Sequence, residues 1–190
     1  MIFVLIIEVL SLLGGEIEHY KHFLPRILEI YNQLNGRGMI GLYEITNKLD
    51  YAKWITWEER EKKTIQDFVL FDWTEFVNEK ESEISESDLE YYSFFFKIND
   101  LLQLWKITEM EKGLRNFVHF FYYYGSEILN KGLRIKGKIY EKEFKDLINQ
   151  DELIEKLETE FFREDEKDQK YAEKISAVIQ MIEHDNLFFP

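Results

Sequence analysis

The sequence contains no cysteine, which excludes disulfide bonds, thiolate metal sites and cysteine nucleophiles. Glycine and proline are also scarce, with nine glycines and two prolines in 190 residues. This scarcity excludes collagen-like and linker-rich chains, and it disfavours a β-sandwich, which needs many turns. No Gly-x-Ser-x-Gly elbow, Walker loop, dinucleotide-binding fingerprint or His-Glu-x-x-His motif occurs. The sequence therefore gives no support to the commonest enzyme classes.

Basic residues are fewer than acidic ones: the chain has 24 lysines and arginines and 37 aspartates and glutamates, which give a formal net charge of −13. A surface of this sign repels phosphate, so we expect no direct binding of nucleic acid. Hydrophobic residues make up 45% of the chain and aromatic residues 16%, which is enough for a packed core and excludes wholesale disorder. The length fits one domain or two small ones, and we predict a single domain over residues 1–190.

The first fifteen residues, MIFVLIIEVLSLLGG, are mostly apolar. They lack the basic start of a signal peptide, they contain Glu8, and they are shorter than the roughly 20 residues of a membrane-spanning helix. We expect a core helix from about Ile2 to Leu13 that ends at Gly14 and Gly15, with a signal peptide or anchor as the alternative. Whether residues 1–13 are the native start stays open. No other stretch is long and apolar enough to enter a membrane, so we expect no membrane contact. With no cysteine in the sequence, we expect a cytoplasmic protein.

Helical periodicity dominates the rest of the chain, because apolar residues recur at steps of three and four. The first such helix has Pro25 at its first position and then carries Ile27, Leu28 and Tyr31 on one face. The last helix presents one apolar face, made of Tyr171, Ile175, Val178, Ile179 and Ile182. The last helix is expected over about 169–183. Between the first and the last helix, we expect helices over about 40–49, 56–77, 88–96, 99–105, 108–124, 140–148 and 152–162.

Three expected helix starts have a hydroxyl residue followed three positions later by glutamate, which is the pattern of a capping box. The hydroxyl residues are Thr56, Ser87 and Thr108. Gly125 is expected to break or bend the helix that Thr108 opens. The segment from Asn130 to Ile139 is rich in glycine and lysine, and it predicts a loop or a small hairpin. The sequence as a whole predicts an all-α fold, a multi-helix bundle or irregular helical array of about eight or nine helices.

Three blocks near the start of the chain form a recognisable combination. His22 to Glu29 reads HFLPRILE, Lys48 to Trp54 reads KLDYAKW, and Trp57 precedes Glu61 at the head of an aromatic-rich helix. Together they resemble an uncharacterised bacterial family with the pattern HFLPRILE, KLxYAxW and WxxxE. The resemblance implies a helical protein of unknown function, and it transfers no catalytic role to any residue.

The aromatic runs are longer than one helix face can bury, which holds for residues 91–96 and for 120–124. We expect most of these rings in the core and the surplus at a surface that contacts a partner, with tyrosines as the exposed members. Residues 131–138 add four basic side chains, which predict either a solvated loop or a contact for phosphate or an acidic partner. The expected interface or pocket residues are His119, Tyr122, Tyr123, Tyr124, Arg134 and Lys136.

The histidines and acids give weaker indications of chemistry. Glu16, His19 and His22 have a spacing that metal sites use, but a di-iron bundle needs a second Glu-x-x-His motif, which the sequence lacks. We therefore expect solvated histidines, no metal and no cofactor, and His119 as a core or rim histidine bonded to a carbonyl rather than a catalytic base.

Two acids stand out from the many that surface charge explains. Glu29 is expected on an otherwise apolar helix face, and Asp72 lies between Phe71 and Trp73 in the sequence. A base such as Arg26, Lys48 or Arg115 is expected to hold such an acid as a structural ion pair.

Three functions compete at this point. The leading hypothesis is a non-enzymatic protein-binding module, of the immunity or inhibitor kind, that binds a basic partner. The first alternative is an acidic DNA mimic, which needs the acids of 79–90 and 151–168 to line one surface. The second is an enzyme or small-ligand binder in whose pocket Glu29, Asp72 or His119 meets an arginine or tyrosine. The partner and the oligomeric state are not set by the sequence.

Overall fold

A computed structural model describes residues 17–33, 41–149 and 151–188. The expected N-terminal helix, with Gly14 and Gly15, lies outside these residues. The chain divides into two compact units, Met1–Gln66 and Asp67–Pro190, with the boundary inside one long helix. Each unit is described by itself below, and the single domain over 1–190 stays a prediction.

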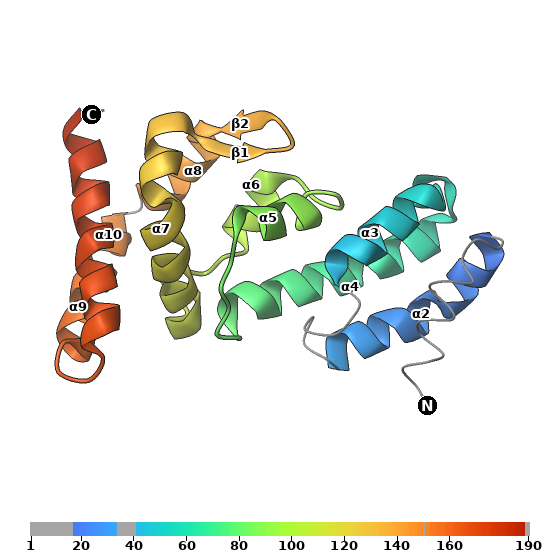
Figure 1. The fold of residues 1–190 in the computed structure, drawn as a ribbon, viewed down its shortest axis with the longest axis horizontal. Coiled ribbons are helices and arrows are strands. Elements are labelled where there is room, and N and C mark those ends of the chain that lie inside the picture. Colours follow the sequence, from blue (N-terminus) through green and yellow to red (C-terminus); the bar gives the residue numbers. More distant parts are fainter. Residues whose placement is uncertain (1–16, 34–40, 150, 189–190) are drawn as a thin grey trace. The chain divides into compact units, whose positions relative to one another are not determined.

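The described residues form nine α-helices, one 3₁₀ helix and one two-stranded sheet (Figure 1), which confirms the all-α prediction. None of these helices is both long enough and apolar enough to cross a membrane. The elements are α2 (Ile17–Gln33), α3 (Leu42–Tyr51), η2 (Trp54–Thr56), α4 (Glu59–Asn78), α5 (Glu86–Tyr92), α6 (Ile98–Gln103), α7 (Glu111–Lys131), β1 (Leu133–Ile135), β2 (Lys138–Tyr140), α8 (Glu141–Ile148), α9 (Asp151–Glu164) and α10 (Gln169–Phe188).

The first unit is held together by a tyrosine and a tryptophan between its helices. The Tyr20 hydroxyl donates to the carbonyl of Ile45 on α3 at 3.3 Å, and the Tyr20 ring lies 6.5 Å from the ring of Trp57. Trp57 Nε1 in turn donates to the carbonyl of Ala52 at 3.0 Å, which fixes the turn before α4. These contacts join α2, α3 and the start of α4 around one small core.

Pro25 lies inside α2, so its predicted place at the first helical position is wrong. Proline cannot donate to the carbonyl four residues earlier, which costs about 3 kcal/mol in a helix interior. The apolar face runs across it, however, because Tyr20 and Leu24 before it and Ile27 and Leu28 after it are all buried. Each such side chain contributes about 1.5–3 kcal/mol on burial, so the stripe outweighs the lost hydrogen bond.

The second unit has an aromatic core centred on Trp105. Its ring centre lies 6.3 Å from that of Trp73, 6.0 Å from Phe117 and 5.7 Å from Phe120. Trp105 Nε1 donates to the carbonyl of Gly113 at 3.0 Å. The rings of the 120–124 run therefore divide as predicted, with the phenylalanines buried and the first two tyrosines exposed.

The predicted capping residues are wrong at all three helix starts. Thr56 ends η2, and its hydroxyl donates to the carbonyl of Lys53 at 2.8 Å. Ser85, not Ser87, caps α5 by accepting from the amide of Asp88 at 3.3 Å, while Met110 precedes α7 without a side-chain cap. The pattern of hydroxyl and glutamate recurs by chance in an acid-rich chain, so it does not by itself mark a helix start.

Gly125 lies inside α7 and does not break it, so the expected break is wrong. A Cβ at Gly125 would lie 2.8 Å from the ring of Phe121, which shows that the missing side chain makes room for that ring. The helix ends instead at Gly132, whose φ of 73° favours glycine and whose amide donates to the carbonyl of Ile128 at 2.7 Å.

The basic segment from Asn130 to Ile139 contains a β-hairpin, which is one of the two structures predicted for it. β1 and β2 pair antiparallel, with Arg134 opposite Ile139. Lys136 and Gly137 have φ values of 50° and 75°, and two positive values are what a two-residue type I′ turn requires. Ile135 is buried under the hairpin while Arg134 faces solvent.

Candidate functional site

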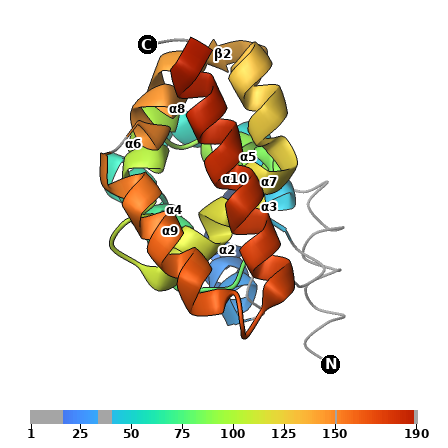
Figure 2. The same cartoon turned by 90° about the vertical axis from the view of Figure 1, so that its left-hand side faces the viewer.

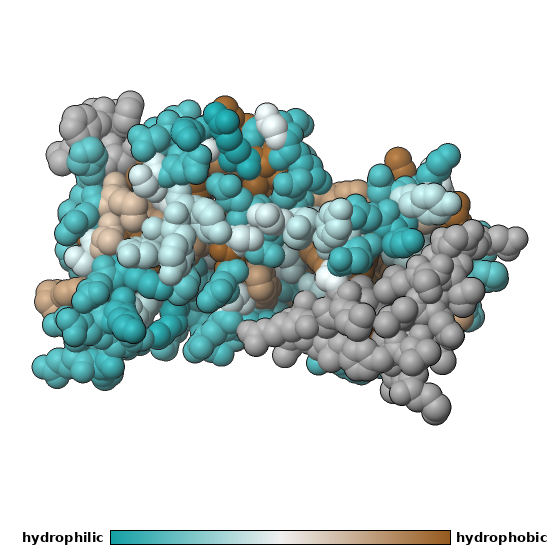
Figure 3. Space-filling model, viewed as in Figure 1, coloured by the Kyte–Doolittle hydropathy of each residue, from teal (hydrophilic) through white to brown (hydrophobic). Residues whose placement is uncertain are grey.

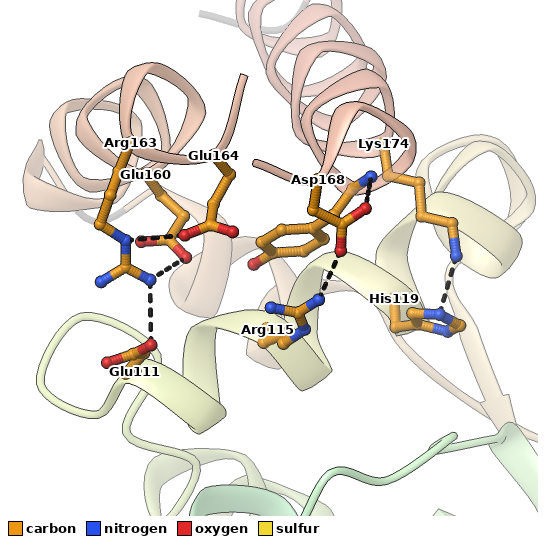
Figure 4. Close-up of polar contacts among 9 residues, drawn as sticks. Glu111, Arg115, His119, Glu160, Arg163, Glu164, Asp168 and Lys174 are labelled. Atoms are coloured by element: carbon orange, nitrogen blue, oxygen red, sulfur yellow. Dashed lines mark hydrogen bonds and ion pairs between the residues drawn. The ribbon is translucent and has the colours of Figure 1, made fainter. Parts of the chain in front are cut away.

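Three helices of the second unit meet where the charged and aromatic side chains gather. α9 and α10 form a helical hairpin, and α10 also packs along α7 (Figures 1 and 2). On the face drawn in Figure 3, hydrophilic residues cover most of the described surface, and hydrophobic residues occupy small separate areas. The close-up in Figure 4 shows the polar contacts between these three helices.

The structure brings three of the predicted site residues together with a lysine from α10. Lys174 Nζ lies 2.7 Å from His119 Nε2 (Figure 4), 5.1 Å from the ring centre of Tyr123 and 5.6 Å from that of Tyr122. The ring of His119 lies 5.4 Å from that of Tyr123. We call His119, Tyr122, Tyr123 and Lys174 the Lys174 cluster. Its lysine is separated from His119 by 55 residues, so no local pattern could have revealed it.

The short contact in the Lys174 cluster requires a neutral histidine, because an ammonium group can only donate. Burial and the charge of Lys174 lower the pKa of His119 below its ordinary value of 6.5, and Glu83 opposes the shift. A histidine with a lowered pKa in the folded state binds its proton less readily there than in the unfolded state, so acid favours unfolding. The contribution of His119 to stability is therefore complete above pH 6.5, and it is lost as the pH falls through the lowered pKa.

We expect Lys174→Met to raise the pKa of His119 towards its ordinary value, because the substitution removes the cation at 2.7 Å. The measurement is an NMR titration of the imidazole protons in the full-length protein. Lys170→Met is the matched control, since it removes an exposed lysine one turn earlier on α10. An unchanged His119 titration in Lys174→Met would contradict the contact.

An arginine on α7 ties the beginning of α10 to the rest of the unit. Arg115 donates to the carboxylate of Asp168 at 2.8 Å (Figure 4), and its guanidinium lies 4.2 Å from the ring centre of Tyr171. Asp168 also accepts from the amide of Tyr171 at 3.1 Å, as an N-terminal cap does. Tyr171 is 4% exposed, and its hydroxyl has no hydrogen-bond partner among the described residues. Burial raises the pKa of this hydroxyl, which therefore stays protonated.

A second arginine gathers three glutamates at the end of α9. Arg163 donates to Glu160 at 2.6 Å, to Glu164 at 3.1 Å and to Glu111 of α7 at 3.0 Å (Figure 4). Glu160 is 5% exposed, and burial raises the pKa of its carboxyl although Arg163 acts in the opposite direction. This network holds α9 against α7, and each of the three glutamates is paired with Arg163. The arrangement is that of a structural brace between helices.

The other three predicted site residues have different surroundings. Tyr124 is half-buried, and its ring lies 5.2 Å from that of Phe120. Arg134 is exposed on β1, and Lys136 lies in the hairpin turn with its Nζ 5.5 Å from the ring centre of Phe94. Their part in an interface stays a prediction.

The two acids singled out in the sequence have different surroundings. Glu29 is exposed and pairs with Arg26, so its expected place on an apolar face is wrong. It lies between buried residues of α2, but the helical turn directs it to solvent. Asp72 is 5% exposed and accepts a hydrogen bond from the Tyr92 hydroxyl at 2.6 Å. The Tyr92 hydroxyl therefore satisfies one of its oxygens in the core.

The proposed metal spacing near the start of the chain falls partly outside the described residues, because Glu16 is not among them. His19 and His22 are both exposed on α2. Across residues 17–33, 41–149 and 151–188, no three histidine, aspartate or glutamate side chains are placed to hold a metal ion.

No family model, curated protein or solved structure matches the chain. The function is therefore inferred from the geometry of the three-helix site.

Proposed function

We propose that the protein is a non-enzymatic protein-binding module that docks through the Lys174 cluster. The observation that carries the proposal is the exposure of two neighbouring rings, 41% for Tyr122 and 62% for Tyr123, beside a half-buried cation. Tyrosine is enriched at protein interfaces because it offers a large apolar area and a polar end that tolerates water. Lysine and histidine hold these rings in place, so little side-chain entropy remains to be lost on docking.

The finer parts of the proposal follow from charge and composition. We propose an inhibitor-like or immunity-like role towards a basic partner, because the net charge of −13 attracts such a partner and speeds association. A cytoplasmic location fits the absence of cysteine. Membership of the uncharacterised bacterial family suggested by the HFLPRILE, KLxYAxW and WxxxE blocks also belongs to the proposal.

One observation supports the alternative function, an acidic DNA mimic. Glu152, Glu155 and Glu158 are all exposed on α9, within the stretch that this function requires. A DNA mimic would compete with duplex DNA for its partner, whereas a module that docks through tyrosines would not. Adding duplex DNA to a purified complex therefore separates the two functions.

We expect Tyr122→Ala/Tyr123→Ala to weaken partner binding about tenfold or more, which is the loss typical of aromatic residues at the centre of an interface. The partner is first recovered on the tagged full-length protein from bacterial extract and identified by mass spectrometry. Its affinity for the wild type and the variant is then measured by calorimetry.

The matched control is Tyr43→Ala/Tyr51→Ala, which removes two exposed tyrosines from the first unit. It is expected to bind the partner as the wild type does. Equal affinities for wild type and Tyr122→Ala/Tyr123→Ala, or an equal loss in the control, would contradict docking through the Lys174 cluster.

A further inference from the structure

α9 carries a large apolar ring on the side that faces away from the unit. Phe162 is 77% exposed, whereas Leu153, Leu157 and Glu160 on the opposite side of the helix are buried. The core of the unit therefore does not use this ring. Phenylalanine is enriched at protein interfaces relative to the rest of the surface, so this exposed ring is available as a contact for a partner.

The neighbours of Phe162 on the same helix face are acidic. Glu158 precedes it by four residues and Glu155 by seven, so both lie on its side of the helix, and both are exposed. Residues 151–168 contain nine acids and three bases, for a net charge of 3 − 9 = −6. This segment carries nearly half of the negative charge of the chain.

The acids on the two sides of α9 differ in their pairing. Glu160 and Glu164, towards the unit, are held by Arg163. The carboxylates of Glu155 and Glu158 have no ion pair or hydrogen bond within the described part of the chain. Within the residues that the structure describes, no arginine or lysine side chain therefore competes with an incoming cation for these two carboxylates.

We propose that the outward face of α9, with Phe162 beside the unpaired carboxylates of Glu155 and Glu158, docks an arginine-rich segment of another protein. A guanidinium group stacks on an aromatic ring and at the same time donates in a fork to carboxylates. A lysine ammonium group is a strongly hydrated point charge, which matches the carboxylates but not the ring as well. The inference goes beyond the proposed function, because it names a second surface and the chemistry of its partner, and it does not depend on the Lys174 cluster.

The test uses the full-length protein and two labelled peptides of equal charge, nona-arginine and nona-lysine, in fluorescence anisotropy titrations. Wild type is expected to bind nona-arginine about twofold to fivefold more tightly than nona-lysine, the size of an exposed cation–π contact. Phe162→Ala is expected to abolish this preference, and Phe162→Tyr, which keeps the ring, to retain it. Glu155→Gln/Glu158→Gln is expected to weaken the binding of both peptides.

Glu81→Gln/Glu90→Gln is the matched control, because it removes the same charge from exposed positions outside α9. It is expected to bind both peptides more tightly than the α9 double variant does. Equal weakening in the two double variants would overturn the proposal, and so would an arginine preference that survives in Phe162→Ala. A wild-type dimer that Phe162→Ala converts to monomer in sedimentation would also overturn it, by assigning the face to a second copy.

Tyr122→Ala/Tyr123→Ala leaves the outward face of α9 intact, so it is expected to bind both peptides as wild type does. Loss of partner binding in that variant with unchanged peptide binding supports two separate surfaces. Failure of the peptide test therefore does not coincide with failure of docking through the Lys174 cluster.

Discussion

Trp73→Ala is expected to lower the free energy of unfolding by about 3–5 kcal/mol, as truncation of a large buried aromatic residue does. Trp73 is 0% exposed, and its ring centre lies 4.8 Å from that of Tyr92. Its Nε1 donates to the carbonyl of Leu101 at 2.9 Å, which joins α4 to α6. The substitution leaves a cavity between these elements and an unpaired carbonyl. Urea denaturation followed by circular dichroism measures the loss.

Phe71→Ala is the matched control, because Phe71 lies two residues earlier on α4 and is 58% exposed. Its removal is expected to change the free energy of unfolding by no more than about 0.5 kcal/mol. Trp73→Phe separates packing from hydrogen bonding, since it keeps most of the ring and costs about 1–3 kcal/mol for the carbonyl left unpaired. Similar losses in Phe71→Ala and Trp73→Ala would show that the core is not where the structure places it.

Asn116→Ala is expected to destabilise the protein by about 3 kcal/mol, because three backbone groups lose their partner at once, through one buried and two partly buried hydrogen bonds. Asn116 lies on α7 and is 3% exposed. Its Nδ2 donates to the carbonyls of Val77 at 3.0 Å and Lys80 at 2.7 Å, and its Oδ1 accepts from the amide of Ser82 at 3.0 Å. One side chain thus fixes the path of the chain after α4. The free energy of unfolding is again measured by urea denaturation.

Asn130→Ala is the control for Asn116, since Asn130 also lies on α7 but is exposed and bonds only the carbonyl of Ser126 among the described residues. It is expected to change stability by about 0.5 kcal/mol or less. Asn116→Asp is expected to cost at least as much as Asn116→Ala, because a carboxylate would face the carbonyls that the amide nitrogen now binds. A stable Asn116→Asp variant would contradict the hydrogen bonds described for this residue.

The helices could be predicted from the sequence because their apolar residues recur at helical spacing. The face predicted for α10 is an example, since four of its five residues, Tyr171, Ile175, Val178 and Ile182, are buried and Ile179 is half-buried. The local signals for helix ends were less informative. Pro25 and Gly125 both lie within helices, because burial on either side of a residue outweighs its own preference.

The candidate site was predictable only in part, for a reason of distance along the chain. Run length alone indicated that some of Tyr122, Tyr123 and Tyr124 must be exposed, and the first two are. Lys174 contacts His119 across 55 residues, and no pattern within one helix encodes such a pair. The pairing of Arg163 with Glu160 had a local signal, the i,i+3 spacing of opposite charges on one helix.

Hydroxyl-radical footprinting of the purified complex tests docking through the Lys174 cluster most directly, because it reports the exposure of each aromatic side chain. On complex formation, oxidation of Tyr122 and Tyr123 is expected to fall, while oxidation of the exposed Tyr43 and Tyr51 in the first unit stays unchanged. Protection of Tyr43 and Tyr51 with unchanged oxidation of Tyr122 and Tyr123 would contradict docking at this site.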